Sequence, residues 1–168
     1  LASLGTAGFV GLGSYITGYL LASVGLPPVL VLIITILVGV LLGLGVGFIS
    51  LRIEGMYLAI ITLGLAEILT VLFKNATGFT GGVSGLNIYS TPVKLLGFIN
   101  MTRETTYFVI VAVMIGLLVL TYNLTKSPVG RAMLSMKNSE SAAQTMGVSS
   151  LKYRLLAFVI ATVFAMIA

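Results

Sequence analysis

The fold of this chain is decided by residues 29–48, which read VLVLIITILVGVLLGLGVGF. Twenty residues in a helix rise about 30 Å, and the hydrocarbon core of a bilayer is about 30 Å thick. The run belongs to an uncharged block from Leu1 to Leu51, which as one helix would be about 77 Å long. The block must therefore cross a membrane more than once. Only helices and closed barrels satisfy their backbone in lipid, and the run lacks the alternating polarity of a barrel strand. We predict an all-α, polytopic transmembrane helix bundle.

The composition of the 168 residues excludes much chemistry. Charged residues make up 8%, against roughly 25% in a soluble domain, so a water-facing surface cannot be built. Without Cys or His there can be no disulfide, thiolate nucleophile, imidazole base or usual zinc site. The phosphate-binding pattern GxxxxGK(S/T) is absent too. We assign the net charge of +5 to membrane topology rather than to nucleic acid, and predict no catalytic or metal-ligating set.

Charges and prolines divide the chain into five predicted spans. In chain order they lie within 1–24, at 29–51, 56–73 and 106–124, and from about 155 onward. Pro27 and Pro28 separate the first two spans, because proline cannot continue a helix interior. A crowd of glycines predicts a broken first span: Gly5, Gly8, Gly11, Gly13 and Gly18. A short polar turn covers 52–55, a long polar connection covers 74–105, and a basic loop covers 125–154.

Basic residues orient these spans. The 125–154 loop contains one acid, Glu140, and five basic residues: Lys126, Arg131, Lys137, Lys152 and Arg154. Because cytoplasmic loops are enriched in Lys and Arg, we place this loop in the cytoplasm and the 74–105 connection outside.

The span at 29–51 carries Gly39, Gly43 and Gly47 at four-residue spacing. This spacing lines the three glycines on one helix face, where another backbone can approach closely. We interpret them as helix-packing positions. The alternative is the general enrichment of glycine in membrane helices.

The 125–154 loop reads as two short helices. Ser127-Pro128 is an N-cap followed by proline at the first helical position, and it predicts a helix over 128–137. Glu140 in a first turn and Gly147 as a stop predict a second helix that starts near Asn138 or Ser139 and runs through Met146. Such a pair either binds anionic lipid or docks a soluble partner. Docking is favoured by its small apolar face, made of Ala142, Ala143 and Met146.

Ordered segments of the chain resemble a known family. The loop contains SPVGRA (127–132), ESAAQTMG (140–147) and KYRLLAF (152–158). Upstream lie GFVGLGSY (8–15), LRIEGMYLAIITL (51–63), GLAEIL (64–69) and TGGVSGL (80–86). In this order they resemble the permease subunits of bacterial ABC importers, most closely those for branched-chain amino acids. Ser141 departs from the usual Glu-Ala-Ala-like run but keeps a small side chain.

The resemblance implies one subunit of a larger machine in a bacterial plasma (inner) membrane, with a fold like that of vitamin-B12-importer permeases. The implied cargo is branched-chain or related small amino acids. The implied partners are two ATPase subunits, a second permease subunit and a periplasmic or extracellular substrate-binding protein. The ATPase subunits would use ATP, and this chain would bind no cofactor. Residues 1–168 would form a single permease domain, truncated at both ends. Its 125–154 loop would couple to the ATPase through Arg131, Glu140, Ala142, Ala143 and Gly147.

Four residues are candidates for the substrate pathway: Thr62, Glu67, Gly81 and Gly82. Glu67 is the only acid well inside a span, where an ionisable group is costly and functional by default. Alternatively, it lies in the outer third of its helix, where it either extends to the membrane interface or pairs with Lys74 on the same face. Thr62 offers a hydroxyl, or bonds back to its own helix. Segment 80–85 offers backbone amides to a carboxylate, or is a plain turn.

Other functions stay open from the residues alone. A related permease could carry another small polar solute, such as urea, an amide or a sugar. A channel or a structural scaffold would leave the capped helix pair unexplained. A membrane-embedded enzyme would need clustered catalytic groups, and the four glutamates are widely scattered.

Overall fold

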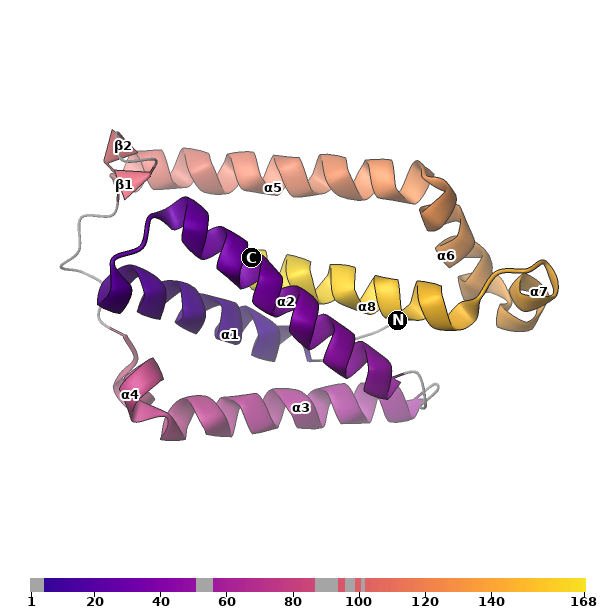
Figure 1. Ribbon diagram of the computed structural model, residues 1–168, viewed down its shortest axis with the longest axis horizontal. Coiled ribbons are helices and arrows are strands. Elements are labelled where there is room, and N and C mark those ends of the chain that lie inside the picture. Colours follow the sequence, from indigo (N-terminus) through magenta and orange to yellow (C-terminus); the bar gives the residue numbers. More distant parts are fainter. Residues whose placement is uncertain (1–4, 51–55, 87–93, 96–98, 101) are drawn as a thin grey trace.

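The computed structural model describes residues 5–50, 56–86, 94–95, 99–100 and 102–168. Over these residues the secondary structure is almost entirely helical (Figure 1). The helices are, in chain order, α1 (Thr6–Tyr19), the π-helical turn η1 (Leu20–Val24), α2 (Pro28–Ser50), α3 (Met56–Asn75), α4 (Thr77–Thr80), the 3-10 turn η2 (Gly82–Ser84), α5 (Arg103–Lys126), α6 (Pro128–Asn138), α7 (Glu140–Thr145) and α8 (Ser150–Ile167). A two-stranded antiparallel ladder pairs β1 (Lys94–Leu95) with β2 (Ile99–Asn100), and Lys94 lies opposite Asn100.

Four helices in the described part of the chain are long and apolar enough to cross a membrane: Thr6–Val24, Pro28–Ile49, Glu104–Lys126 and Ser150–Ile167. They confirm the prediction of an all-α, multi-pass protein. The break before the second span is also confirmed, because α2 begins at Pro28, where the missing N–H of proline costs no hydrogen bond. The third predicted span is a helix of 20 residues, α3, and its crossing of the membrane stays a prediction. The predicted turn at 52–55 lies outside the described residues.

The centre of the bundle is the crossing of α2 and α8, the most extensive contact between two helices (Figure 1). Glycines on α2 make this close approach possible. A Cβ on Gly43 would lie only 2.9 Å from the Cα of Val159, and a Cβ on Gly47 would lie 3.3 Å from the Cβ of Phe158. Gly39 faces α8 as well. All three glycines with four-residue spacing therefore lie at one helix–helix contact.

Helix α1 lies between α3 and the crossed pair of α2 and α8. A Cβ on Gly13 would lie 2.5 Å from the carbonyl oxygen of Met166 in α8, and a Cβ on Gly8 would lie 3.0 Å from the Cα of Ala66 in α3. The prediction of a broken first span is therefore wrong. The glycines allow neighbouring backbones to approach, while α1 itself runs without a break, and the irregular turn η1 comes after it.

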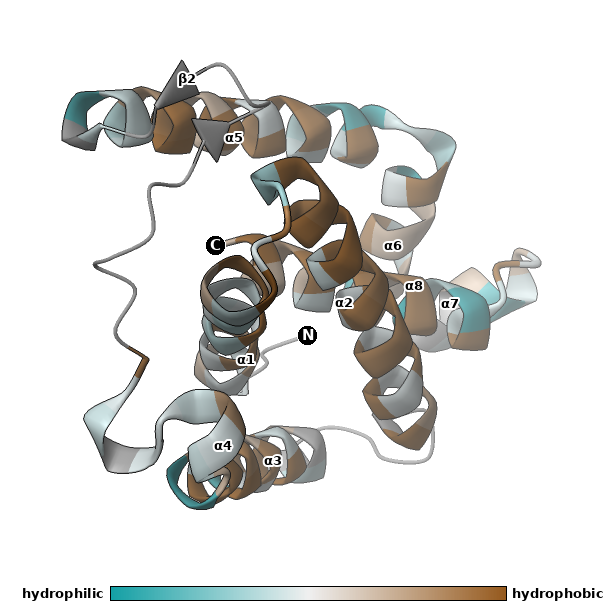
Figure 2. Ribbon diagram, turned by 60° about the vertical axis from the view of Figure 1, so that its left-hand side comes forward, coloured by the Kyte–Doolittle hydropathy of each residue, from teal (hydrophilic) through white to brown (hydrophobic). Residues whose placement is uncertain are grey.

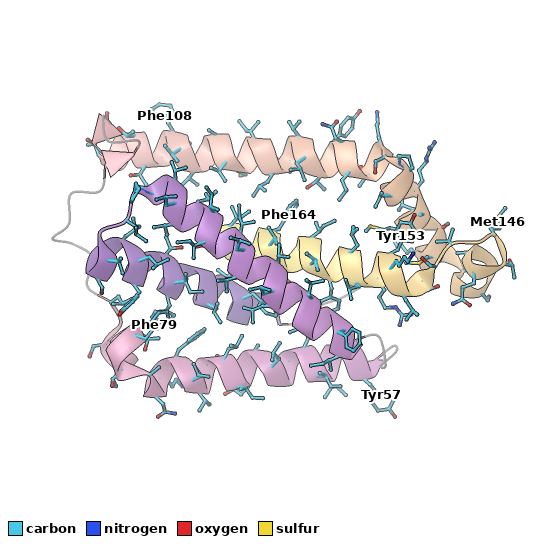
Figure 3. The ribbon with its side chains drawn as sticks, in the orientation of Figure 1. Tyr57, Phe79, Phe108, Met146, Tyr153 and Phe164 are labelled. Carbon is cyan, nitrogen blue, oxygen red and sulfur yellow. The ribbon has the colours of Figure 1, made fainter. Side chains whose placement is uncertain are left out.

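Helix α5 lies at the edge of the bundle and joins the rest through α6 (Figure 2). Within the most apolar part of α5, no residue is buried. Its apolar side chains, such as Phe108 and Leu118, are exposed in this chain (Figure 3). This helix therefore stays separate from the core and carries α6 and α7 at its far end.

The basic loop is shorter than predicted, because α8 begins at Ser150 rather than near residue 155. Lys152 and Arg154 consequently belong to the first turns of a span. Long basic side chains can extend their charged ends from a helix terminus to water while the stems remain in an apolar environment. Lys152 and Arg154 therefore mark where the apolar run of the last span begins, but helix α8 itself begins before them.

Candidate functional site

A sharp elbow joins α5 to α6. The Oγ of Ser127 caps α6 by accepting a hydrogen bond of 3.2 Å from the N–H of Gly130. The N–H of Ser127 donates to carbonyl oxygens in the last turn of α5. A Cβ on Gly130 would overlap the carbonyl oxygen of Leu124 and lie 2.6 Å from the Cα of Thr125. Ser127 therefore forms hydrogen bonds both at the end of α5 and at the start of α6. Only a glycine at position 130 leaves room for α6 to pack this closely against the end of α5.

The end of α7 is closed by two backbone hydrogen bonds. The N–H of Val148 donates to the carbonyl of Ala143, and the N–H of Gly147 donates to the carbonyl of Gln144, both at 3.0 Å. This is a Schellman motif, and Gly147 has the positive φ, 82°, that the motif requires. The predicted helix stop at Gly147 is thus confirmed. The side-chain amide of Gln144 donates to the Oγ of Ser150 at 3.0 Å, which ties α7 to the first residue of α8.

The small apolar face expected on α7 does not face outward as a unit. Ala143 is only 4% exposed, and its helix α7 contacts both α6 and α8. A helix of six residues cannot hold its position alone, so one face packs against its neighbours. Ala143 therefore supports the loop rather than forming a docking surface. The side chains of Glu140 and Ala142 lie outside the described residues.

Two large apolar side chains between α5 and α8 are exposed among the residues whose side chains the structure describes. Met146 is 86% exposed and stands at the far end of the protein (Figure 3). Leu134 of α6 is 51% exposed. Arg131 is exposed on the same helix, and Lys126 contacts Tyr122, with its Nζ 4.3 Å from the ring centroid. An exposed apolar tip is suited to contact with another protein.

Thr62 is 1% exposed, and its Oγ1 donates to the carbonyl of Ala59 in its own helix at 3.0 Å. A Cβ on Gly5 would lie 2.6 Å from the carbonyl oxygen of Thr62. Both observations place Thr62 in the contact between α1 and α3. Its hydroxyl is therefore occupied and not directed into a pathway.

Glu67 lies on a different side of α3 and is exposed. Because α3 continues to Asn75, Glu67 is residue 12 of 20 and lies near the middle of the helix, not in its outer third. In the described part of the chain it forms no hydrogen bond or ion pair, so the suggested pairing with Lys74 is not formed. No group of three metal-binding side chains gathers among the described residues.

The segment after α3 is a structured turn. Thr80 is fully buried, and its Oγ1 lies within hydrogen-bonding distance of the carbonyl oxygens of Phe73 and Ala76. The N–H of Gly82 donates to Thr80 Oγ1 at 3.1 Å, and the N–H of Gly81 donates to a carbonyl in α4. The expectation that these two amides are free for a carboxylate therefore does not hold. They are used within the turn, and the pathway candidates are not brought together.

Sequence reasoning missed three features that shape these sites. Glycine is a poor helix former, so Gly130 at the third position of a helix was a signal of close approach. Thr80 gave no signal, because its partners depend on how the turn folds. Two ring contacts link α1 to α3 and α4, and their signal was the four-residue spacing of two tyrosines. The ring centroids of Tyr15 and Phe73 are 4.9 Å apart, and those of Tyr19 and Phe79 are 4.8 Å apart.

Comparison with known proteins covers the whole chain. A family described as "Branched-chain amino acid transport system / permease component" matches residues 1–168. The chain is 33% identical to the "High-affinity branched-chain amino acid transport system permease protein LivM" of Salmonella typhimurium, and 32% identical to the protein of the same name from Escherichia coli. Each alignment covers 98% of this chain but 44% of the relative, so the chain spans less than half the length of the curated relatives it matches. No solved structure shows a significant match.

Proposed function

This chain belongs to the permease-component family of branched-chain amino acid transport systems, and on this premise we propose that it forms part of the membrane path of an ATP-driven importer. The proposed cargo is branched-chain or related small amino acids, because both relatives are named as high-affinity permeases for them. The protein crosses a bacterial plasma membrane several times, which agrees with its candidate spans.

The observation that carries the proposal is the placement of α6 and α7. They extend beyond the bundle and connect α5 to α8 (Figure 1). Ser127 caps α6 and also donates hydrogen bonds to carbonyl oxygens at the end of α5, which fixes α6 to α5, and the bond from Gln144 to Ser150 fixes α7 to α8. A displacement of α7 would therefore be transmitted to two candidate spans, α5 and α8. A permease driven by a soluble ATPase requires such a connection, whereas a channel does not.

We propose that different partners of the importer bind at the two opposite ends of the helix bundle. Two ATPase subunits, which use the ATP, dock on the cytoplasmic side, and one of them receives the tip of α7. Met146 fits this role, because an exposed methionine is flexible and adapts to an apolar groove. A second permease subunit completes the path. A substrate-binding protein delivers the amino acid at the opposite end, near α4 and the β1–β2 ladder.

The proposed path passes along surfaces that this chain shares with other chains. Thr62 and the amides of Gly81 and Gly82 take part in internal hydrogen bonds, so they serve the fold. Among the four pathway candidates, Glu67 alone keeps a free polar group.

Replacement of Met146 tests the docking role. In the full-length protein, Met146→Glu places a charge where an apolar contact is expected, and an unpaired charge is costly to bury. We expect ATPase copurification in detergent to fall at least about tenfold, which corresponds to about 1.4 kcal/mol. Met146→Leu should keep the contact, and Ser84→Glu adds the same charge at the opposite end as a control. Full copurification and uptake with Met146→Glu would exclude α7 as the coupling element.

A further inference from the structure

Exposed basic side chains gather at the end of the bundle that carries α6 and α7. Between residues 125 and 154 the chain has five basic residues and one acid, Glu140. Four of the five are exposed: Lys126, Arg131, Lys137 and Lys152. Within the described part of the chain, none of these four forms an ion pair. Their charges are therefore available to groups outside the described residues.

The lengths of the two spans at this end place the basic residues near the lipid headgroups. Helix α5 has 24 residues and is about 36 Å long, so Lys126 at its end stands just beyond a hydrocarbon core of about 30 Å. Helix α8 has 18 residues and is about 27 Å long, so Lys152 in its first turn also lies near the membrane surface. Tyr122, one turn before Lys126, is 58% exposed, and tyrosine is enriched at this interface.

Helix α6 connects these two positions across the end of the bundle (Figure 1). Its start lies at the same depth as the end of α5, because a Cβ on Gly130 would lie 2.6 Å from the Cα of Thr125. The helix also contacts α8. The side chains of α6 are therefore within reach of the headgroup layer.

One side of α6 combines basic and apolar groups. Arg131, Leu134 and Lys137 follow one another at three-residue spacing, so they share a side of the helix, and all three are exposed. We call these three residues the exposed side of α6. Half-buried residues lie on another side: Val129, Met133 and Met136. An apolar side chain between basic ones is typical of helices that lie in a membrane interface and bind anionic lipid.

The charge and the depth of this surface favour lipid over a protein partner. Lysine and arginine donate charge-assisted hydrogen bonds to phosphate oxygens. An anionic membrane supplies many phosphates at the depth where the four exposed basic residues lie. Each lysine or arginine near such a surface strengthens binding about fivefold. A protein partner would need several acidic side chains placed at the same depth.

We propose that the exposed side of α6, together with Lys126 and Lys152, binds the headgroups of anionic phospholipids, with Leu134 directed towards the acyl chains. The lipid contact fixes α6 along the membrane surface, while Met146 at the tip of the loop remains free for the ATPase. Arg131, which the family resemblance assigns to ATPase coupling, contacts lipid phosphate instead.

Fluorescence quenching by lipid tests this contact. The full-length protein carries its only cysteine in place of Leu134, labelled with bimane, in nanodiscs without ATPase. Phosphatidylglycerol or phosphatidylcholine, each with a nitroxide high on the acyl chain, is added in increasing fraction. We expect half-maximal quenching at a fraction of phosphatidylglycerol at least about tenfold lower than that of phosphatidylcholine. No quenching, as when another segment of the full-length chain covers α6, or equal quenching by both lipids would overturn the proposal.

A second labelling position controls for unspecific contact with lipid. Met146 is more exposed than Leu134, at 86% against 51%, but it stands at the tip of the loop. Bimane in place of Met146 should not be quenched by either lipid. Quenching of equal strength at both positions would show that the loop meets lipid without a defined site, and the proposal would fail.

A matched pair of substitutions tests the charges. Lys137→Gln removes one positive charge from the exposed side of α6. It should raise about fivefold the fraction of phosphatidylglycerol needed for half-maximal quenching at position 134. Lys74→Gln removes the same charge at the far end of α3 and should leave that fraction unchanged. Equal effects of the two variants, or no effect of Lys137→Gln, would refute the electrostatic contact.

Addition of purified ATPase to the nanodiscs separates lipid from protein as the occupant. Quenching at position 134 should persist after the ATPase binds. Its loss would assign the exposed side of α6 to the ATPase and overturn the proposal. Because the quenching is measured without ATPase first, the lipid contact is tested independently of the coupling role proposed for α7.

Discussion

Replacing Gly130 by alanine tests whether the elbow between α5 and α6 controls coupling. The new methyl group would overlap the carbonyl oxygen of Leu124, and it would lie 2.6 Å from the Cα and 2.7 Å from the carbonyl oxygen of Thr125. Carbon atoms in ordinary contact are about 3.5–4.0 Å apart, so α6 must shift by about 1 Å. The obstructing atoms belong to the backbone and cannot rotate away. Overpacking of this kind costs about 1–3 kcal/mol.

The shift grows along α6. Gly130 is three residues past the Ser127 cap, about 4.5 Å along the axis, whereas Asn138 is about 16 Å along it. If α6 pivots at the cap, a displacement of about 1 Å at Gly130 becomes about 4 Å at the far end of the helix. Met146, at the tip of the loop, would then be displaced from the groove proposed to receive it.

The assay compares Gly130→Ala with Gly116→Ala in the full-length protein. No atom lies within 4 Å of a Cβ on Gly116, so that methyl group meets open space. We expect both variants to insert in the membrane in normal amounts. Gly130→Ala should lose ATPase copurification and uptake by at least about tenfold, as expected for more than 1.4 kcal/mol, and Gly116→Ala should retain both. Normal uptake and copurification with Gly130→Ala would show that the elbow angle is not needed for coupling.

Three further predictions concern packing, the turn after α3 and orientation. Gly43→Ala should destabilise the α2–α8 contact by about 1–3 kcal/mol in a detergent unfolding assay, because its Cβ would lie 2.9 Å from a backbone atom. The Cβ of the control variant Gly45→Ala meets open space, so this variant should keep its stability. Equal effects of the two substitutions would refute this account. Thr80→Val removes the acceptor of the Gly82 N–H and should speed hydrogen exchange at that amide, while unchanged exchange would show that the bond is unimportant. A cysteine at Ser84 should react with an impermeant thiol reagent on intact cells, and a cysteine at Ser135 only after permeabilisation; the reverse pattern would invert the orientation.

Long uncharged runs and local end signals predicted the helices well. The Ser127 cap begins α6 and Gly147 follows the end of α7, as expected, and α2 begins at Pro28, one residue before the predicted start. These signals act within a few residues, through the missing N–H of proline, a capping hydroxyl or a positive φ, so they can be read without a fold. The start of α8 was misplaced because Lys152 and Arg154 were taken as loop residues, although such side chains are tolerated at a helix end.

The family resemblance was also visible in the sequence, as ordered short segments, and the comparisons agree with it. The chemistry of the proposed sites was not. Thr62 and Gly82 have the right polar groups for a pathway, but the fold uses those groups in internal hydrogen bonds. Ala143 has the right size for a docking face, but it is buried within this chain.

By itself, the sequence determined that this chain is a helical membrane protein, where most of its helices lie and which end carries the basic loop. These properties depend on hydropathy, charge and capping, which act locally along the chain. Only the tertiary structure decided that Gly43 meets Val159, that Gly64 meets nothing, and that Glu67 stands on the side of α3 opposite its packed face. The physical reason is that such contacts join residues far apart in the sequence. A helix offers several faces of similar hydrophobicity, and packing against a particular neighbour selects one of them.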